Sequence, residues 1–210
     1  MRREPLPYKS LWEIDAYPKV GTVQIFCDGG LAGPKNPSPE GGTWAYLIRI
    51  RQLASWELVG AGAGRISPAD YGLTSVSNNI SELVAMVEGL RAAEFAVPDN
   101  PKQVLSDSWI TLQRVFRGAR MNNLPPELKA LAMIAPDFVK GGYLLLDGHP
   151  TKLDLERGVG KRGNPVHLGN LYCDVACQSQ RPERATWANA VIESTLKEMF
   201  PVFAGENKEG

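Results

Sequence analysis

The stretch TVQIFCDGG, residues 22–30, alternates apolar and polar side chains and then ends on an aspartate followed by two glycines. Such alternation is typical of a β-strand with one buried face. Asp-Gly is a common turn dipeptide, so one interpretation of Asp28 is an ordinary turn former. The other is that the strand presents a bare carboxylate to a metal ion. This stretch alone does not decide between them, but the rest of the chain does.

The composition indicates one globular domain with or without extensions. The chain has 210 residues, of which 43% are hydrophobic, and its 23 basic and 23 acidic residues give a formal net charge of zero. This total does not suggest nucleic-acid binding by itself, although it is compatible with a local basic groove. The three cysteines indicate reduced thiols in a cytosolic protein. Because no apolar run has membrane-spanning length and no signal peptide is present, we expect a soluble, cytoplasmic protein that does not bind membranes.

Hydrophobic periodicity predicts the order of the elements. Strands are expected over 22–28, 43–52 and 55–66, with a loop rich in glycine and proline over 29–42. The pattern then changes to helical spacing over 77–96. Beyond it we expect a strand over 102–108, helices over 108–119 and 125–138, a strand over 141–149, a polar loop over 151–170, and helices over 170–180 and 182–200.

This order predicts an α/β fold with one mixed five-stranded sheet. The first three strands follow one another closely, which favours an antiparallel meander, and the later strand–helix connections favour parallel pairing with helices on both faces. We expect an N-terminal extension over 1–20 that drapes over the domain or stays loose. The catalytic domain is expected over 21–181, and a C-terminal helix and tail over 182–210.

Four acidic residues lie where these elements begin or end. Asp28 and Asp107 follow strands, and Glu82 and Asp174 are expected in the first turns of helices. Singly, each has an ordinary interpretation as a turn former, a helix cap, a first-turn acid or a solvated side chain. If they converge at one edge of the sheet, their repulsion requires cations. Carboxylates suit Mg²⁺ or Mn²⁺, and two such ions about 4 Å apart support hydrolysis of a phosphodiester.

Several motifs together resemble ribonuclease H of type 1. VQIFCDGG is similar to the family's first strand, SNNISELVAMVEGLRAA to the helix that carries its catalytic glutamate, and LSDSWITLQRV to its strand ending in aspartate-serine. LLLDGHP resembles the strand before its Gly-His loop, and GNLYCDVACQ its closing helix. The motifs occur in the family's order over about residues 22–180.

The resemblance implies a site and an activity. Asp28, Glu82, Asp107 and Asp174 would bind two Mg²⁺ ions, with Mn²⁺ as the alternative. The family hydrolyses the RNA strand of RNA–DNA hybrids, leaving 5′-phosphate and 3′-hydroxyl ends. The remaining implied roles are substrate binding by Asn78, Asn79, Gly29 and Gly30, where the glycines would let nucleic acid approach the backbone.

Three features leave alternatives open. His149 matches the family's loop histidine, but His167 lies closer to Asp174 and could serve instead. Asp147 is a rival of Asp174 as fourth ligand, and we prefer Asp174 because it lies four residues after Asn170, as in the family motif. The family's basic insert has no clear counterpart, so binding without help is expected to be weak and sensitive to salt.

Other classes of function also fit the same fold. A resolvase, an exonuclease or a non-catalytic binding module are the alternatives, whereas the usual motifs of a metal-dependent phosphatase are missing. The asparagines before Glu82 favour contact with RNA, and the complete set of carboxylates favours an enzyme. The sequence leaves open whether the protein works with replication partners and what its oligomeric state is.

Overall fold

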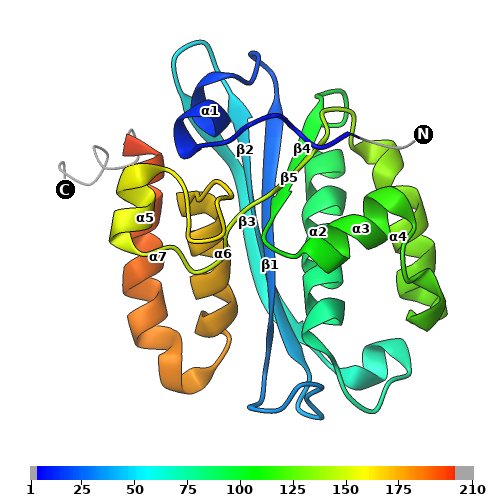
Figure 1. Cartoon of the computed structure of the whole chain (residues 1–210). Coiled ribbons are helices and arrows are strands. Elements are labelled where there is room, and N and C mark those ends of the chain that lie inside the picture. Colours follow the sequence, from blue (N-terminus) through cyan, green and yellow to red (C-terminus); the bar gives the residue numbers. More distant parts are fainter. Residues whose placement is uncertain (1–3, 202–210) are drawn as a thin grey trace.

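The structure, a computed structural model, describes residues 4–201 and contains one five-stranded sheet with helices on both faces (Figure 1). The strand order is β3-β2-β1-β4-β5. The strands are β1 (Val23–Leu31), β2 (Gly42–Arg51), β3 (Trp56–Ile66), β4 (Lys102–Ser106) and β5 (Tyr143–Leu145). β2 pairs antiparallel with both β1 and β3, and β4 pairs parallel with both β1 and β5. The α/β fold with a mixed five-stranded sheet is therefore confirmed.

β1 is longer than its parallel neighbour, and this difference opens one edge of the sheet. Its pairing with β4 ends at Phe26 opposite Leu105, whereas its pairing with β2 continues to Leu31 opposite Gly42. The loop expected from residue 29 therefore begins later, because the backbone of Gly29 and the two following residues still pairs with β2. Beyond Phe26 the backbone edge of β1 that faces β4 is not paired with that strand. This leaves space beside Asp28 and the residues that follow it.

The helices lie in two layers. α2 (Asn78–Ala96), α3 (Trp109–Arg117) and α4 (Pro126–Phe138) cover one face of the sheet (Figure 1). The other face is covered by α1 (Leu11–Ala16) and α6 (Leu168–Ser179), and α7 (Ala185–Met199) packs on α6. α5 (Lys152–Arg157) connects β5 to α6 on this side.

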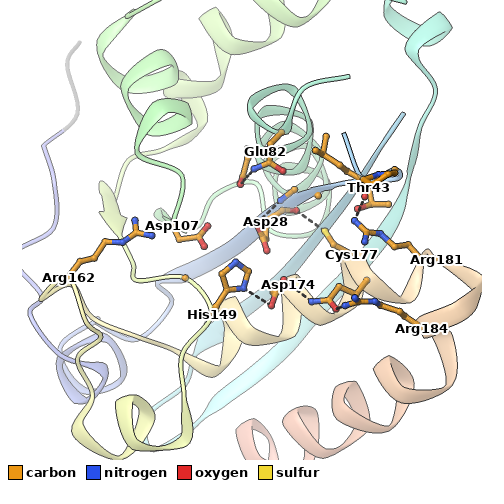
Figure 2. Close-up of a pocket in the computed structure, with 18 residues that line it drawn as sticks. Asp28, Thr43, Glu82, Asp107, His149, Arg162, Asp174, Cys177, Arg181 and Arg184 are labelled. Carbon is orange, nitrogen blue, oxygen red and sulfur yellow. Dashed lines mark hydrogen bonds and ion pairs between the residues drawn. The ribbon is translucent and has the colours of Figure 1, made fainter. Parts of the chain in front are cut away.

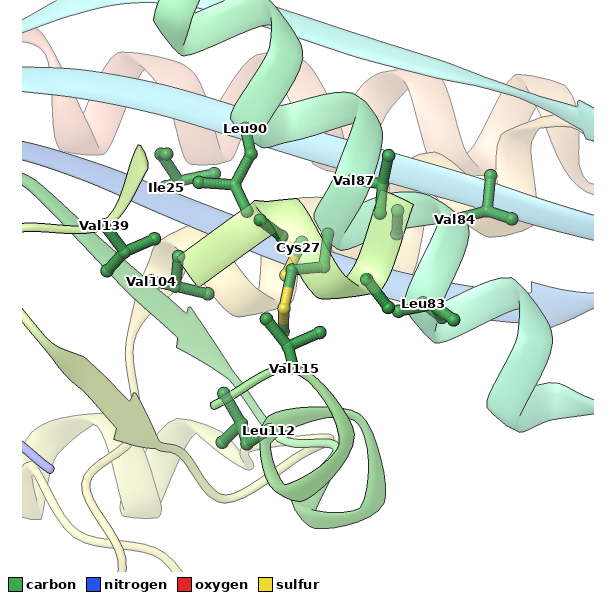
Figure 3. Close-up of a cluster of buried hydrophobic side chains, with 14 of the residues drawn as sticks. Ile25, Cys27, Leu83, Val84, Val87, Leu90, Val104, Leu112, Val115 and Val139 are labelled. Atoms are coloured by element: carbon green, nitrogen blue, oxygen red, sulfur yellow. The ribbon is translucent and has the colours of Figure 1, made fainter. Parts of the chain in front are cut away.

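Two apolar clusters hold these layers together. On the α2 face, Ile25 and Cys27 of β1 pack with Leu83, Val87 and other residues of α2, and with side chains from β4, α3 and α4 (Figure 3). Successive β-strand residues point to opposite faces, so Phe26 contributes to the second cluster with α1 and α6. The alternation in the first strand of the sequence thus supplies both halves of the core.

The segment before β1 packs against the domain. The amide of Leu6 donates to the carbonyl of Tyr143 at 2.7 Å, which places this segment beside the edge strand β5. α1 begins at the N-cap Ser10 and buries Ile14 in the second cluster. The boundaries at residues 20/21 and 181/182 stay predictions.

Two helices differ from the sequence-based prediction. The segment 151–170, for which the sequence predicts a polar loop, contains α5. The predicted N-terminal extension over 1–20 contains α1. α5 opens with a reciprocal cap, in which the Thr151 hydroxyl accepts from the amide of Asp154 and the Asp154 carboxylate accepts from the amide of Thr151. β5 is shorter than the expected strand over 141–149, because the chain leaves the sheet after Leu145.

Among residues 4–201, no helix combines the length and the apolar character that crossing a membrane requires.

Gly29 allows β1 and α2 to touch. A Cβ atom at Gly29 would lie 2.2 Å from the carbonyl carbon of Ser81 and 2.2 Å from the amide nitrogen of Glu82. Both are backbone atoms of α2, so neither can rotate away. The missing side chain at Gly29 therefore sets the distance between the strand and the helix.

We expect Gly29→Ala to lower the free energy of unfolding by about 3 kcal/mol, the upper end of the usual cost of overpacking. Gly60→Ala is the matched control, since a Cβ atom there would have no neighbour within 4 Å. The control is expected to change the free energy of unfolding by no more than about 0.5 kcal/mol. Urea unfolding of the three proteins measures both effects, and equal stabilities would contradict the role assigned to Gly29.

Candidate active site

Asp28 lies at the edge that β1 exposes beyond the end of β4. Its side chain is buried, with 6% of the residue exposed, and its Oδ1 accepts a hydrogen bond from the amide of Gly29 at 2.8 Å. Asp28 lies in β1 just beyond the carboxyl end of β4, where the pairing between these two parallel strands has ended at Phe26 opposite Leu105. Ligand sites of open α/β sheets commonly lie outside the carboxyl ends of their strands.

Glu82 reaches the same place from α2. It is the fifth residue of that helix and therefore lies in the second turn, not in the first turn as expected. The close approach of α2 to Gly29 brings its carboxylate toward Asp28 (Figure 2). Oε1 accepts from the side-chain amide of Asn78 at 3.1 Å, while the buried Oε2 has no protein partner.

Asp107 follows β4 directly and precedes Ser108, the N-cap of α3. Its Oδ1 is buried without a protein partner. A Cβ atom at Gly148 would lie 2.1 Å from Oδ2 of Asp107, so the backbone of the loop after β5 packs directly on this carboxylate. Glycine at position 148 is therefore required by the site.

The three carboxylates form one buried acidic cluster. One oxygen from each of Asp28, Glu82 and Asp107 lies within 4.8 Å of the others. Burial, followed by repulsion from the neighbouring carboxylates, raises the pKa of Asp28 and of Glu82 well above the ordinary values. Burial also raises the pKa of Asp107. The folded protein without metal thus disfavours full ionisation of this cluster.

Asp174 lines the same cleft but has other partners. It is the seventh residue of α6 and so lies in the second turn, one turn later than expected. Its Oδ2 is 3.0 Å from Nδ1 of His149, and its Oδ1 accepts from Nε2 of Gln178 at 3.1 Å. Figure 2 shows His149 and Asp174 beside the acidic cluster.

His149 is held at the mouth of the cleft. Its backbone has a φ of 50°, an uncommon value for a residue with a side chain. The hydrogen bond and the charge of Asp174 raise the pKa of His149 to about 9. Since the side chain is 77% exposed, solvent screens this ion pair and we derive no stability from it.

The two alternatives from the sequence lie elsewhere. His167 is buried as the N-cap of α6, where its Nδ1 accepts from the amide of Gly169 and its Nε2 is 3.1 Å from Oδ1 of Asp15. Burial lowers the pKa of His167 to about 4. Asp147 accepts from the amide of Arg162 at 2.7 Å and from the side chain of Asn164 at 3.0 Å, so it fastens the loop before α6. Neither residue lines the cleft.

The expected substrate-binding residues divide into two groups. Gly29, Gly30 and Asn78 line the cleft, whereas Asn79 does not. The carbonyl of Asn79 accepts from Nη1 of Arg114 at 3.3 Å, which places this residue toward α3. The expectation that Gly29 leaves space for nucleic acid requires a correction, because the backbone of α2 occupies the space where a side chain would lie.

The cleft has a volume of about 530 Å³ and also contains basic residues. Arg162 belongs to a loop that the sequence marked as basic, but Arg181 and Arg184 were not predicted. They follow the last recognisable motif, and nothing in their local sequence separates them from ordinary surface arginines. Figure 2 shows Arg162 near Asp107, with Arg181 and Arg184 on the opposite side of the cluster.

The donor set of the cleft fits divalent cations. The buried oxygens of Glu82 and Asp107 that lack protein partners are available to an ion, and so is the carboxylate of Asp28. Hard oxygen donors of this kind favour Mg²⁺ or Mn²⁺ over softer metals. Asp174 could join them if its carboxylate turned from His149 toward the cluster.

Comparison with known proteins supports the fold. No protein-family model matches the chain, and neither does any curated protein. Among solved structures, the N-terminal RNase H domain of a Mycobacterium tuberculosis protein, solved as a fusion with maltose-binding protein, aligns with a TM-score of 0.50 and 16% identity, over 80% of this chain and 98% of that chain. LC9-RNase H1, a type 1 RNase H with the type 2 active-site motif, aligns with a TM-score of 0.52 and 14% identity, over 85% of this chain and 86% of that chain.

The chain has the ribonuclease H fold. A third similar structure, the protease-reverse transcriptase of prototype foamy virus, aligns with a TM-score of 0.50 and 12% identity, over 85% of this chain and 22% of that chain. Identities this low establish the fold and leave the chemistry to be argued from the cleft. In this protein the acidic cluster lies just beyond the point where the pairing between the parallel strands β1 and β4 ends.

The raised pKa values predict that stability without metal falls as the pH rises. The folded protein keeps protons on Asp28 and Glu82 at a pH where the unfolded chain, with ordinary values of about 4, has lost them. The free energy of unfolding should therefore decrease as the pH rises above about 4, the ordinary pKa of these carboxylates. Saturating Mg²⁺ should remove most of this decrease, because the cation stabilises the ionised form.

Thermal unfolding as a function of pH, with chelator and with Mg²⁺, measures the effect. Glu82→Gln is the matched control, since it removes one charge from the cluster and leaves His149 and His167 to titrate as before. Its stability should depend less on pH and respond less to Mg²⁺. Identical pH profiles for the two proteins would show that the cluster is not repulsive.

Proposed function

We propose that this protein is a metal-dependent endonuclease that hydrolyses the RNA strand of RNA–DNA hybrids and leaves 5′-phosphate and 3′-hydroxyl ends. The observation that carries the proposal is the buried cluster of Asp28, Glu82 and Asp107, with two oxygens that no protein group satisfies. Such a cluster is unfavourable in a protein without cations, and it lies in an open cleft. The ribonuclease H fold and the order of the sequence motifs favour this nuclease over other metal-dependent hydrolases.

In this proposal the acidic residues hold two Mg²⁺ ions, with Mn²⁺ as the alternative. Asp28, Glu82 and Asp107 are the principal ligands, and Asp174 is the fourth. When bound, the ions would activate a water molecule for in-line attack and stabilise the charge on the leaving oxygen. Asp28 lies on β1, Glu82 lies on α2 and Asp107 directly follows β4, and these elements are all packed into the core.

His149 is proposed to act on the proton of the leaving group. In the protein without metal, the hydrogen bond and the charge of Asp174 raise the pKa of His149 to about 9, and Nδ1 of the imidazole faces that carboxylate. Nε2 is then available to donate a proton to the 3′-oxygen as the bond from phosphorus to that oxygen breaks. Proton donation by a positioned side chain typically contributes about 10²- to 10⁴-fold to a rate.

Selection of RNA is proposed to depend on Asn78. Its side-chain amide donates to Glu82 and lines the cleft, so its carbonyl oxygen can accept a hydrogen bond from a 2′-hydroxyl of the cleaved strand. Proteins that distinguish RNA from DNA commonly do so through this hydroxyl. A DNA nuclease on the same fold, such as a resolvase or an exonuclease, would not need this contact. Location in the cytoplasm and partners in replication stay predictions.

Cleavage of a labelled RNA–DNA hybrid in Mg²⁺ tests the proposal. Single-stranded RNA, duplex DNA and branched DNA serve as competing substrates, and each is repeated in Mn²⁺. We expect the RNA strand of the hybrid alone to be cut. Asp107→Asn should lower the rate at least about 100-fold, because loss even of groups that only support metal ligands costs 10- to 100-fold.

The outcomes separate the alternatives. Cutting of branched or duplex DNA would keep the metal site and overturn the assignment to RNA. Binding of the hybrid without cutting in either metal would favour a non-catalytic module. Asp147→Asn tests the alternative fourth ligand. Because Asp147 also fastens the loop that carries Arg162, thermal unfolding is measured beside the rate, and a large loss of rate with an intact fold would contradict the choice of Asp174 as fourth ligand.

His149→Ala should lower kcat about 100-fold at neutral pH, the lower end of the range for proton transfer. The loss should shrink for a hybrid whose leaving oxygen is replaced by sulfur, since a thiolate leaves without protonation. His167→Gln tests the alternative, and we expect it to lower thermal stability more than kcat because His167 is the buried N-cap of α6. The opposite pattern would reassign the catalytic histidine.

A further inference from the structure

Three arginines line the cleft and form no ion pair within the described part of the chain. They are Arg162, Arg181 and Arg184. No acidic side chain among residues 4–201 lies within ion-pair distance of them, so the protein does not neutralise these guanidinium charges. Arg181 and Arg184 come from the turn between α6 and α7, on one side of the acidic cluster (Figure 2).

Arg181 is fixed by the protein but only partly satisfied. Its Nη2 donates to the carbonyl of Leu31, which fastens it to the end of β1. Its Nε is buried and has no protein partner. Burying a donor without a partner is unfavourable, so an unsatisfied group at the edge of a cleft points to a ligand.

Thr43 supplies a second unsatisfied group beside it. Its Oγ1 is buried without a protein partner, and a Cβ atom at Gly30 would lie 2.8 Å from this hydroxyl. Gly30 thus leaves room beside this hydroxyl, which is itself buried. Both residues line the cleft together with Arg181, and Figure 2 shows Thr43 close to Arg181.

Arg184 is joined to Asp174 by a short chain of hydrogen bonds. Its Nη1 donates to Oε1 of Gln178 at 2.6 Å, and Nε2 of the same glutamine donates to Asp174 at 3.1 Å. One side chain therefore separates the guanidinium from a proposed metal ligand. An anion held by Arg184 would lie next to the reacting centre.

We propose that Arg181 and Arg184, which lie beside Thr43, form a phosphate subsite that binds a backbone phosphate of the cleaved strand next to the scissile one. This inference rests on the proposed nuclease function. Guanidinium groups match the geometry of phosphate oxygens. The subsite binds charge and carries no base specificity, since phosphate contacts position a strand without reading its sequence.

Two properties of the chain make such a subsite necessary. Among residues 4–201, no Phe, Tyr or Trp side chain lines the cleft, so His149 is the only aromatic ring available there for base stacking. The net charge of zero provides no general attraction for a polyanion. The unpaired arginines of the cleft then counter the repulsion between its carboxylates and the negatively charged substrate.

The test measures how the affinity for a hybrid depends on salt. An inactive Asp107→Asn protein binds a fluorescent RNA–DNA hybrid in Mg²⁺ at several salt concentrations, with and without Arg184→Gln. Loss of one phosphate contact should make the slope of log K against log salt shallower by about 1. The affinity itself should fall roughly 10-fold, the worth of one charged hydrogen bond.

Arg157→Gln is the matched control, because Arg157 is exposed at the end of α5 and does not line the cleft. Arg157→Gln should leave the slope of log K against log salt unchanged. Arg184→Lys keeps the positive charge and should have a slope close to that of the protein with Arg184. In the active protein, Arg184→Gln should raise KM more than it lowers kcat. Gln178→Ala should instead act mainly on kcat, since that glutamine positions Asp174.

An unchanged slope for Arg184→Gln, in a protein that cuts hybrids, would overturn the subsite and leave the nuclease function standing. An equal slope change in Arg157→Gln would also overturn it, because the effect would then be general charge. If the protein binds duplex DNA and not hybrids, the same slopes measured on that DNA test the subsite while the RNA assignment fails. Arg181→Lys, checked by thermal unfolding, provides an independent variant, and loss of affinity with an intact fold supports the proposal.

Discussion

Repulsion among three buried carboxylates is the constraint on which the arrangement of this protein depends. Asp28, Glu82 and Asp107 come from a strand, a helix and the residue after another strand, and one oxygen of each lies within 4.8 Å of the others. Burial and mutual repulsion both oppose their ionisation. The two apolar clusters, one on each face of the sheet, supply the stability that offsets this strain. A divalent cation bound in the cleft would therefore favour the ionised form of these carboxylates.

Glycines at two positions make this convergence possible. Gly29 lets the backbone of α2 approach β1, and Gly148 lets the loop after β5 pack on Asp107. Any side chain at either position would push a carboxylate away from the cluster. The early end of the pairing between β1 and β4 then exposes the cluster on one side. The bare aspartate followed by two glycines in β1 therefore has a structural explanation before any substrate is considered.

The sequence predicts most of the fold because its signals are local. Alternation in the first strands and helical spacing in α2 are both read from neighbouring residues, and α5 could have been found from the Thr151–Asp154 cap. The choice between His149 and His167 could not, because it depends on which one the tertiary structure buries against Asp15. Arg181 and Arg184 were missed for the same reason: only the fold brings the turn after α6 to the end of β1. Sequence motifs identify the acidic groups, while their basic neighbours follow from packing.

The positions of the charged side chains in the cleft favour one path for a bound strand. The carboxylates repel a polyanion, so a strand can approach them only when cations are bound or when basic groups hold it nearby. Arg162 lies on one side of the cluster, and Arg181 and Arg184 lie on the other (Figure 2). In the proposed function, a strand that contacts the arginines on both sides would cross the acidic cluster between them, which would place one phosphate at the proposed metal ligands. A chain with zero net charge can in this way position a highly charged substrate, because the position of a few unpaired charges matters more than their sum.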